Sequence, residues 1–280
     1  MRAWSRAERA RGRKIGFVPT MGFLHEGHLR LVDRARELSD GVVLSIFVNP
    51  LQFGPQEDFE AYPRDLARDR QVAQDRGVDC LFVPERQAMY PAPPVARVEP
   101  GPLGNGFEGG ARPNHFSGVL TVVAKLLHLA EPDVAVFGRK DFQQAVLVRQ
   151  MVQDLDFPTS IDVAPTVREL DGLALSSRNT YLTPDQRRSA LALSRTLRAV
   201  EQAWRGGEAD AAALARRGME TLKAPGVEPQ YLGLVDDALQ PVARVTARTV
   251  ALVAARVGTT RLIDNVVLGE GIAADPTVRP

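Results

Sequence analysis

Two histidines in the segment IGFVPTMGFLHEGH, residues 15–28, are the side chains best spaced to do chemistry. His25 and His28 lie three residues apart where apolar residues begin to recur at near-helical spacing, so both rings would share one side of a first helical turn. A helix start exposes unpaired backbone N–H groups and the positive end of the helix dipole, which together attract anions. The segment therefore predicts a polyphosphate site in which two imidazoles face charge that develops during a reaction.

The same two side chains could instead bind a metal, or be ordinary polar residues at a helix start. A metal site has little support from composition, because the chain has four histidines and one cysteine. The remaining histidines, His115 and His128, show no ligand-like spacing. These residues alone leave the three interpretations open.

Other polar residues also come directly after apolar stretches of sequence that are expected to be buried. Gln52 is brought to the end of an apolar run at 41–48, and ligands of parallel sheets bind at the carboxyl ends of strands. Lys140 follows Gly138 between another apolar run and a helix start, where its charge suits phosphate. The sequence Ser176-Ser177-Arg178 supplies hydroxyls and a guanidinium in a later loop. These segments suit a polyphosphate ligand. The ordinary alternatives are that Lys140 is a solvated surface residue and that Ser176–Arg178 is a plain interdomain linker.

Composition narrows the class of protein. The 280 residues are 44% hydrophobic and 25% charged, as in an ordinary soluble globular chain. The net charge of +1 gives no general attraction to nucleic acid or membrane, and no uncharged apolar run approaches a bilayer span. Cys80 is the single cysteine, which excludes an intramolecular disulfide and fits a cytoplasmic location. The Arg-rich residues 1–14 faintly resemble a transit peptide, but a short helix is expected there.

Helix-like and strand-like segments alternate along the first part of the chain. The expected strands are 15–18, 41–48, 78–83, 134–137 and 161–163, and the expected helices are about 28–38, 59–76, 115–129 and 142–154. This order predicts an α/β fold with a Rossmann-like doubly wound parallel sheet. The Pro/Gly-rich residues 84–115 are expected to form a long excursion with at most one short strand, at 95–98.

A smaller α/β domain is expected from about residue 168. Thr183 should cap a helix that has Pro184 at its first position. The expected elements are helices at 184–204 and 208–223 and strands at 231–235, 249–257 and 261–268.

Six segments, taken together, give the chain a specific resemblance. They are PTMGFLHEGH (19–28), SIFVNPLQFGPQEDFEAYPR (45–64), RPNHFSGVLTVVAKLL (112–127), FGRKDFQQ (137–144), PTVRELDGLALSSRN (165–179) and GTTRLIDN (258–265). The chain closely resembles the pantoate–β-alanine ligase family of the HxGH nucleotidyltransferase superfamily. The resemblance implies a two-step reaction in which pantoate and ATP give pantoyl adenylate and pyrophosphate, and β-alanine then gives pantothenate and AMP.

The resemblance also implies an organisation and partners. It implies an ATP- and pantoate-binding domain at 1–167, a C-terminal lid domain at 168–280, a requirement for Mg²⁺, and a homodimer.

Roles for individual residues follow from the same resemblance. His28 matches the proton donor, and His25, Lys140 and Arg178 are the other catalytic candidates. The remaining ATP-binding candidates are Met21, Gly22, Gly138, Asp141, Val167, Leu175, Ser176 and Ser177. Substrate-binding candidates are Gln52, Gln144, Asn49 and Tyr62, and Asp69 is the metal candidate.

Two positions depart from the family pattern. Arg139 stands where the family commonly has glutamate in GEKD, and Arg68 stands where an acidic residue often precedes Asp69. The second change puts in doubt a metal contact through position 68.

Two rival functions remain at this stage. One is another adenylyl-transferring enzyme, such as a nicotinate or pantetheine-phosphate adenylyltransferase, whose substrate would carry a phosphate that Gln52 and Gln144 suit poorly. The other is a nucleotide-sensing module without turnover.

Overall fold

The computed structural model describes residues 1–273, which divide into two compact units. Unit 1 comprises residues 1–138 and 143–164, and unit 2 comprises residues 139–142 together with residues 165–273. The short segment Arg139–Phe142 therefore packs with unit 2, although it lies between two elements of unit 1 in the sequence. The expectation that the N-terminal domain binds ATP and pantoate, and that the C-terminal domain acts as a lid, stays a prediction.

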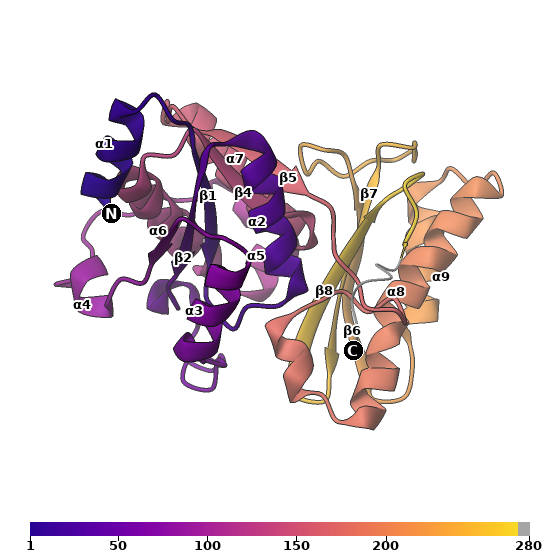
Figure 1. Ribbon diagram of the computed structural model, residues 1–280. Helices are drawn as coiled ribbons and strands as arrows, with labels where there is room; N and C mark the ends of the chain where they lie inside the picture. The colour runs from indigo at the N-terminus through magenta and orange to yellow at the C-terminus, as the bar shows by residue number, and fades with distance from the viewer. Residues whose placement is uncertain (274–280) are drawn as a thin grey trace. The chain divides into compact units, whose positions relative to one another are not determined.

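Unit 1 alternates strands and helices, as Figure 1 shows. Its elements are α1 (Arg2–Ala10), β1 (Ile15–Thr20), α2 (Glu26–Leu38), β2 (Gly41–Ile46), the 3₁₀ turn η1 (Pro50–Gln52), α3 (Leu66–Asp75), β3 (Cys80–Phe82), α4 (Arg86–Met89), η2 (Pro102–Gly104), α5 (Phe107–Ala111), α6 (His115–Ala130), β4 (Val134–Gly138), α7 (Phe142–Asp154) and β5 (Ser160–Ala164).

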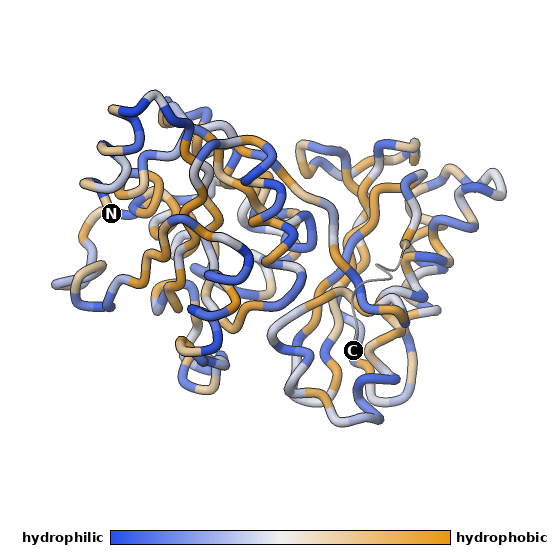
Figure 2. Tube along the Cα trace, in the orientation of Figure 1, coloured by the Kyte–Doolittle hydropathy of each residue, from blue (hydrophilic) through white to orange (hydrophobic). Residues whose placement is uncertain are grey.

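The five strands form a parallel sheet in the order β3-β2-β1-β4-β5. Alternate residues of a strand point to opposite faces, so Ile15 and Phe17 join the core beneath α6 and α7, whereas Val18 joins the core beneath α2 and α3. The expected doubly wound sheet is confirmed. Figure 2 shows the hydrophobic residues following the strands. The strand order reverses between β1 and β4, and this is where sheets of this kind bind ligands.

Two expected elements differ from the structure. Residues 59–65 are not helical, because Pro63 disfavours a preceding helix and the Asp65 side chain caps α3 by accepting from the Arg68 N–H at 3.0 Å. Residues 95–98 form no strand. The surrounding excursion instead contains α4, η2 and α5, which are too short for a periodic apolar pattern to reveal.

Unit 2 is a three-stranded antiparallel sheet that packs against two helices. Its elements are η3 (Arg139–Asp141), η4 (Ser177–Tyr181), α8 (Pro184–Arg205), α9 (Ala211–Leu222), β6 (Val227–Val235), β7 (Val250–Val257) and β8 (Thr260–Val267). Thr183 caps α8 as expected, and Gln186 completes the capping box. Strand β6 begins earlier than expected, at Val227, and its pairing with β7 is irregular between Pro229 and Tyr231. Across residues 1–273, no helix is both long and apolar enough to cross a membrane.

Candidate active site

A tight turn follows β1 and carries the chain into α2. Gly22 has φ +84°, and a Cβ at this position would lie 2.8 Å from Ile46 Cγ2 and 3.0 Å from Asp69 Oδ2. Only glycine fits both the conformation and the space. Phe23 also has positive φ, at 50°, so two successive residues have left-handed backbone.

The start of α3 holds this turn in place. Asp69 is 1% exposed, and its two carboxylate oxygens accept the Phe23 and Leu24 N–H groups at 2.7 Å each. Arg68 donates to the Leu24 carbonyl at 2.8 Å. The departure at position 68 thus supplies a backbone contact, and the contacts of Asp69 favour a structural role. Its predicted role as a metal ligand is not tested by these contacts.

His25 and His28 lie together at the first turn of α2, as their spacing predicted. His25 is the N-cap residue, and the two rings stack with centroids 4.0 Å apart and planes 25° apart. The His25 backbone N–H donates to His28 Nδ1 at 3.3 Å. Because Nδ1 accepts this bond, a neutral His28 carries its proton on Nε2, which is then the nitrogen able to donate to a phosphate oxygen.

Gln52 and Met21 are brought together at the carboxyl ends of β1 and β2. Gln52 Nε2 donates to Met21 Sδ at 3.2 Å, and Asn49 Nδ2 donates to Gln52 Oε1 at 3.1 Å. Asn49 is 1% exposed and also donates to the Gly118 carbonyl at 3.0 Å. A Cβ on Gly118 would lie 2.3 Å from the Leu51 carbonyl oxygen, so this glycine lets the loop lie directly on α6.

A hydrogen-bonded clamp holds the main chain of Gln52. His115 Nδ1 lies 2.9 Å from the Gln52 carbonyl oxygen, and Arg112 Nη1 lies 3.0 Å from His115 Nε2. Arg112 also makes two 2.7 Å hydrogen bonds to the Glu57 carboxylate. A carbonyl can only accept and a guanidinium can only donate, so His115 is the neutral tautomer with its proton on Nδ1.

Burial, together with the charge of Arg112, shifts the pKa values of the titrating groups in this clamp. Burial lowers the pKa of His115 to about 4, and the positive charge of Arg112 acts in the same direction. Burial alone would raise the pKa of Glu57, but its hydrogen bonds to Arg112 bring it below its ordinary value. Nearby, burial raises the pKa of Tyr90 to about 12, and its hydroxyl donates to Asn49 Oδ1 at 3.0 Å. All these polar groups therefore keep one ionisation state around neutral pH.

The remaining candidates of unit 1 have different surroundings. Tyr62 is 6% exposed, and its ring lies 6.0 Å from that of Phe53. Gln143 is 3% exposed, accepts the Glu108 N–H at 2.9 Å and is therefore structural. Its neighbour Gln144 is only partly buried, and its role in binding substrate stays a prediction. Gly138 ends β4 beside β5.

Unit 2 contains the other predicted phosphate-binding segments. Lys140 lies in η3, with Nζ 3.4 Å from the carboxylate of Asp141. In the segment before η4, the Leu175 N–H donates to the Val167 carbonyl at 3.0 Å, so two residues predicted to contact the nucleotide are paired.

The Ser176–Arg178 segment follows directly. The hydroxyl of Ser176 accepts the Arg178 N–H at 3.2 Å and caps η4. Ser177 is 6% exposed, and its carbonyl accepts from the Thr180 hydroxyl at 2.8 Å. The segment is therefore a folded turn.

Three polar residues that hold the predicted site segments have no role predicted from the sequence. Arg112 and His115 lie in a segment that carries the family resemblance, as does Asn265, yet spacing alone gave them no function. Their contacts join positions up to 126 residues apart, and no local pattern encodes such a distance.

No ready-made metal site accompanies these side chains. Within residues 1–273, no group of three or more histidine, cysteine or carboxylate side chains could hold an ion. Magnesium commonly binds through one or two carboxylates together with phosphate oxygens of a substrate, which does not require such a group.

A doubly wound parallel sheet is typical of a nucleotide-binding α/β protein, and here the His25–His28 pair follows β1, beside the switch point of the sheet. Residues 1–267 match the family model described as pantoate-beta-alanine ligase. The pantothenate synthetase of Moorella thermoacetica is 51% identical over 270 residues, which cover 96% of this chain and 95% of that protein. The chain therefore belongs to the pantoate–β-alanine ligase family.

Solved structures agree with this assignment. Pantothenate synthetase from Thermus thermophilus superposes with a TM-score of 0.89 at 48% identity, over 94% of this chain and 97% of that one. Pantoate-beta-alanine ligase from Francisella tularensis, complexed with beta-gamma ATP and beta-alanine, gives a TM-score of 0.78 at 35% identity, over 96% of each chain.

Proposed function

We propose that this protein condenses (R)-pantoate with β-alanine at the expense of ATP, releasing pantothenate, AMP and pyrophosphate through a pantoyl-adenylate intermediate. Family membership supports the overall reaction. The observation that carries the proposal for the site is the stacked His25–His28 pair at the N-terminus of α2, beside the switch point of the sheet. Both the helix end and the imidazole donors stabilise negative charge.

In the first step, a pantoate carboxylate oxygen attacks the α-phosphorus, and the bond to pyrophosphate breaks. His28 donates from Nε2 to a phosphate oxygen as charge grows on the leaving group, and His25, Lys140 and Arg178 stabilise the same charge. Contacts to the rest of the nucleotide fall to the residues predicted for ATP: Met21, Gly22, Gly138, Asp141, Val167, Leu175, Ser176 and Ser177.

In the second step, the amine of β-alanine attacks the acyl carbon, and AMP leaves. Gln52 and Gln144 hold the hydroxyls and carboxylate of pantoate, because a neutral amide both donates and accepts. Asn49 and Tyr62 are proposed for the substrate side as well. The hydrogen bond from Asn49 to Gln52 Oε1 orients that amide, which supports at least an indirect role.

Magnesium is proposed to enter with ATP, and it would neutralise phosphate charge there. We also propose that the protein acts in the cytoplasm as a homodimer, which rests on the family likeness. Light scattering coupled to size exclusion would measure the mass of the assembly directly.

Exchange of labelled pyrophosphate into ATP tests the proposed function. The exchange should require pantoate and should proceed without β-alanine, because adenylate formation alone is reversible. Nicotinate mononucleotide or phosphopantetheine in place of pantoate should give none. Exchange with either phosphorylated compound, or no exchange with pantoate, would overturn the proposal.

A further inference from the structure

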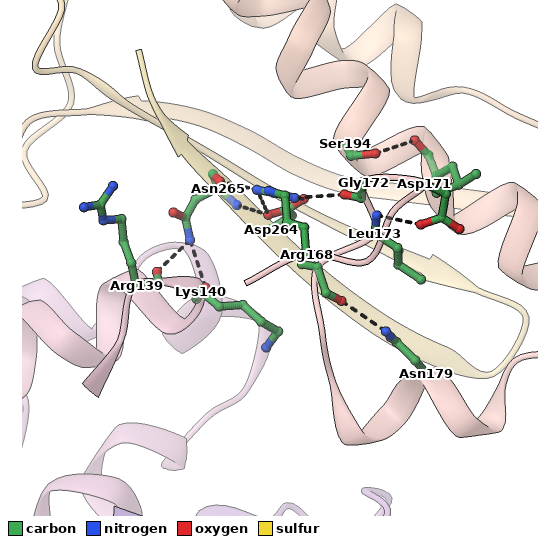
Figure 3. Close-up of polar contacts among 12 residues, drawn as sticks. Arg139, Lys140, Arg168, Asp171, Gly172, Leu173, Asn179, Ser194, Asp264 and Asn265 are labelled. Atoms are coloured by element: carbon green, nitrogen blue, oxygen red, sulfur yellow. Dashed lines mark hydrogen bonds and ion pairs between the residues drawn. The ribbon is translucent and has the colours of Figure 1, made fainter. Parts of the chain in front are cut away.

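One buried amide on β8 holds the turn that carries Lys140 (Figure 3). Asn265 is 2% exposed, and its Nδ2 donates to the Arg139 carbonyl at 2.8 Å and to the Lys140 carbonyl at 2.9 Å. Both partners can only accept, so the orientation of the amide is fixed by its surroundings. Two successive peptide groups of η3 are thereby attached to one side chain.

A second contact attaches the same turn to the end of β8. Arg139 forms an ion pair with Glu270, beyond the strand. The arginine side chain is 21% exposed and the glutamate 54%, so this contact is the weaker of the two. The amide of Asn265 is therefore the principal attachment.

Asp264, the residue before Asn265, connects β8 to the loop that contains Arg168 and Gly172. Arg168 and Asp264 form a buried, bidentate ion pair with N–O distances of 2.6 and 2.7 Å, and their side chains are 4% and 3% exposed. Arg168 also donates to the Gly172 carbonyl at 3.1 Å and to the Asn265 carbonyl at 2.9 Å. The Asn265 N–H donates to Asp264 Oδ1 at 2.7 Å.

The loop that Arg168 anchors leads into Ser176–Arg178. Just after these residues, Asn179 Nδ2 donates to the Ala174 carbonyl and to Glu169 Oε1, both at 3.1 Å. Glu169 is 4% exposed and accepts from Arg187 of α8 at 2.7 Å. The chain on both sides of the serine pair is thus held by buried polar contacts.

We propose that Asn265 is a positioning residue for Lys140, and that the Asp264–Arg168 pair joins the Lys140 turn and the Ser176–Arg178 loop into one frame built on β8. The proposal rests on the proposed roles of both segments in binding the phosphates of ATP. It explains why Arg139–Phe142 packs with unit 2 although its neighbours in sequence belong to unit 1. The frame places the positive groups before the nucleotide binds, so ATP does not have to order them.

The test replaces Asn265 by alanine and by aspartate, and makes the same two changes at the exposed Asn105 as a matched control. Asn265→Ala removes both donors, whereas Asn265→Asp sets a carboxylate against two carbonyl oxygens. We expect the KM for ATP to rise about tenfold in the alanine variant and further in the aspartate variant. The KM for pantoate should stay within about twofold, because Gln52 and Gln144 belong to unit 1, whereas the frame belongs to unit 2. Both Asn105 variants should match the parent.

A double-mutant cycle separates positioning from general stability. If Asn265 acts through Lys140, then Asn265→Ala should change the ATP Kd by less than about twofold in the Lys140→Ala background. A tenfold effect in both backgrounds, or a parental ATP Kd for Asn265→Ala alone, would overturn the inference. ATP Kd, measured by calorimetry without pantoate, does not depend on the acid substrate. The cycle therefore still decides the positioning role if the pantoate-dependent exchange fails.

Discussion

At the scale of single residues, His28 and Asp69 differ in which of their polar atoms accept hydrogen bonds from the backbone. The Nδ1 of His28 accepts the His25 N–H, which puts the proton on Nε2, the nitrogen that can donate to a phosphate. By contrast, both oxygens of Asp69 already accept backbone N–H groups. The neighbours Gln143 and Gln144 also differ, because Gln143 is buried and hydrogen-bonded to backbone groups whereas Gln144 is only partly buried.

His28→Ala should lower the rate of adenylate formation by about a hundredfold or more and change ATP affinity far less, because its proton matters most as charge builds on pyrophosphate. A single-turnover measurement of pantoyl adenylate checks this. His128→Ala, at an exposed position, is the control. An unchanged single-turnover rate would remove His28 from the mechanism.

Arg139→Glu should keep adenylate formation and weaken ATP binding about two- to fivefold, as the loss of a half-exposed ion pair implies. The loss of ATP affinity should be larger at low salt than at high salt. Adding Glu270→Arg restores an opposite-charge pair and should recover the affinity, whereas Lys140→Ala should abolish adenylate formation at any salt. The test is ATP Kd at two ionic strengths, and failure of the second change to rescue would show that the pair with Glu270 is irrelevant.

At the scale of elements, the N-terminal ends of two helices hold the segments that carry the predicted site residues. The start of α3 holds the turn before α2, and the start of α6 holds the main chain of Gln52 through His115. Each device joins elements far apart in the sequence. Substitutions at the start of α3 or α6 should therefore affect the segment that each of them holds.

Asp69→Asn should lower the free energy of unfolding by about 2 kcal/mol, because the new NH₂ group opposes one of two buried N–H groups. The rate of adenylate formation should also fall, because the turn that Asp69 holds leads into His25. Urea denaturation and activity are compared with Asp75→Asn, an exposed carboxylate on the same helix. Recovery of activity at raised Mg²⁺ would instead favour the predicted metal role of Asp69.

The His115 clamp predicts a pH dependence of stability. The pKa of His115 is lowered to about 4 in the folded protein, so the unfolded chain takes up a proton first as pH falls below about 6.5. Stability from this group is complete above pH 6.5 and declines as pH falls toward 4. Between pH 7.5 and 5 the parent should lose about 2 kcal/mol more than His115→Asn, which keeps a donor near Nδ1 but does not titrate. Urea melts at both pH values measure the difference, with His128→Asn as control, and equal losses would exclude the clamp as the titrating group.

At the scale of the whole molecule, the sequence predicted the sheet well because buried parallel strands such as 41–48 are nearly continuous apolar runs. It also predicted the His25–His28 pair, since a helix brings residues three apart together. The helices α4 and α5 were missed because they are too short to show a period. Asn265 and Arg112 had no assigned role because only the folded chain brings their partners near.

Activation of pantoate as an acyl adenylate moves one of its carboxylate oxygens onto AMP, so the fate of these oxygens tests the proposed mechanism. Pantoate with a heavy-oxygen-labelled carboxylate is turned over with ATP and β-alanine, and the products are analysed by mass spectrometry. We expect one labelled oxygen to appear in AMP and one to remain in pantothenate, because the attacking oxygen bonds to the α-phosphorus and leaves with it. Unlabelled AMP, or label in inorganic phosphate together with ADP, would contradict the adenylate mechanism.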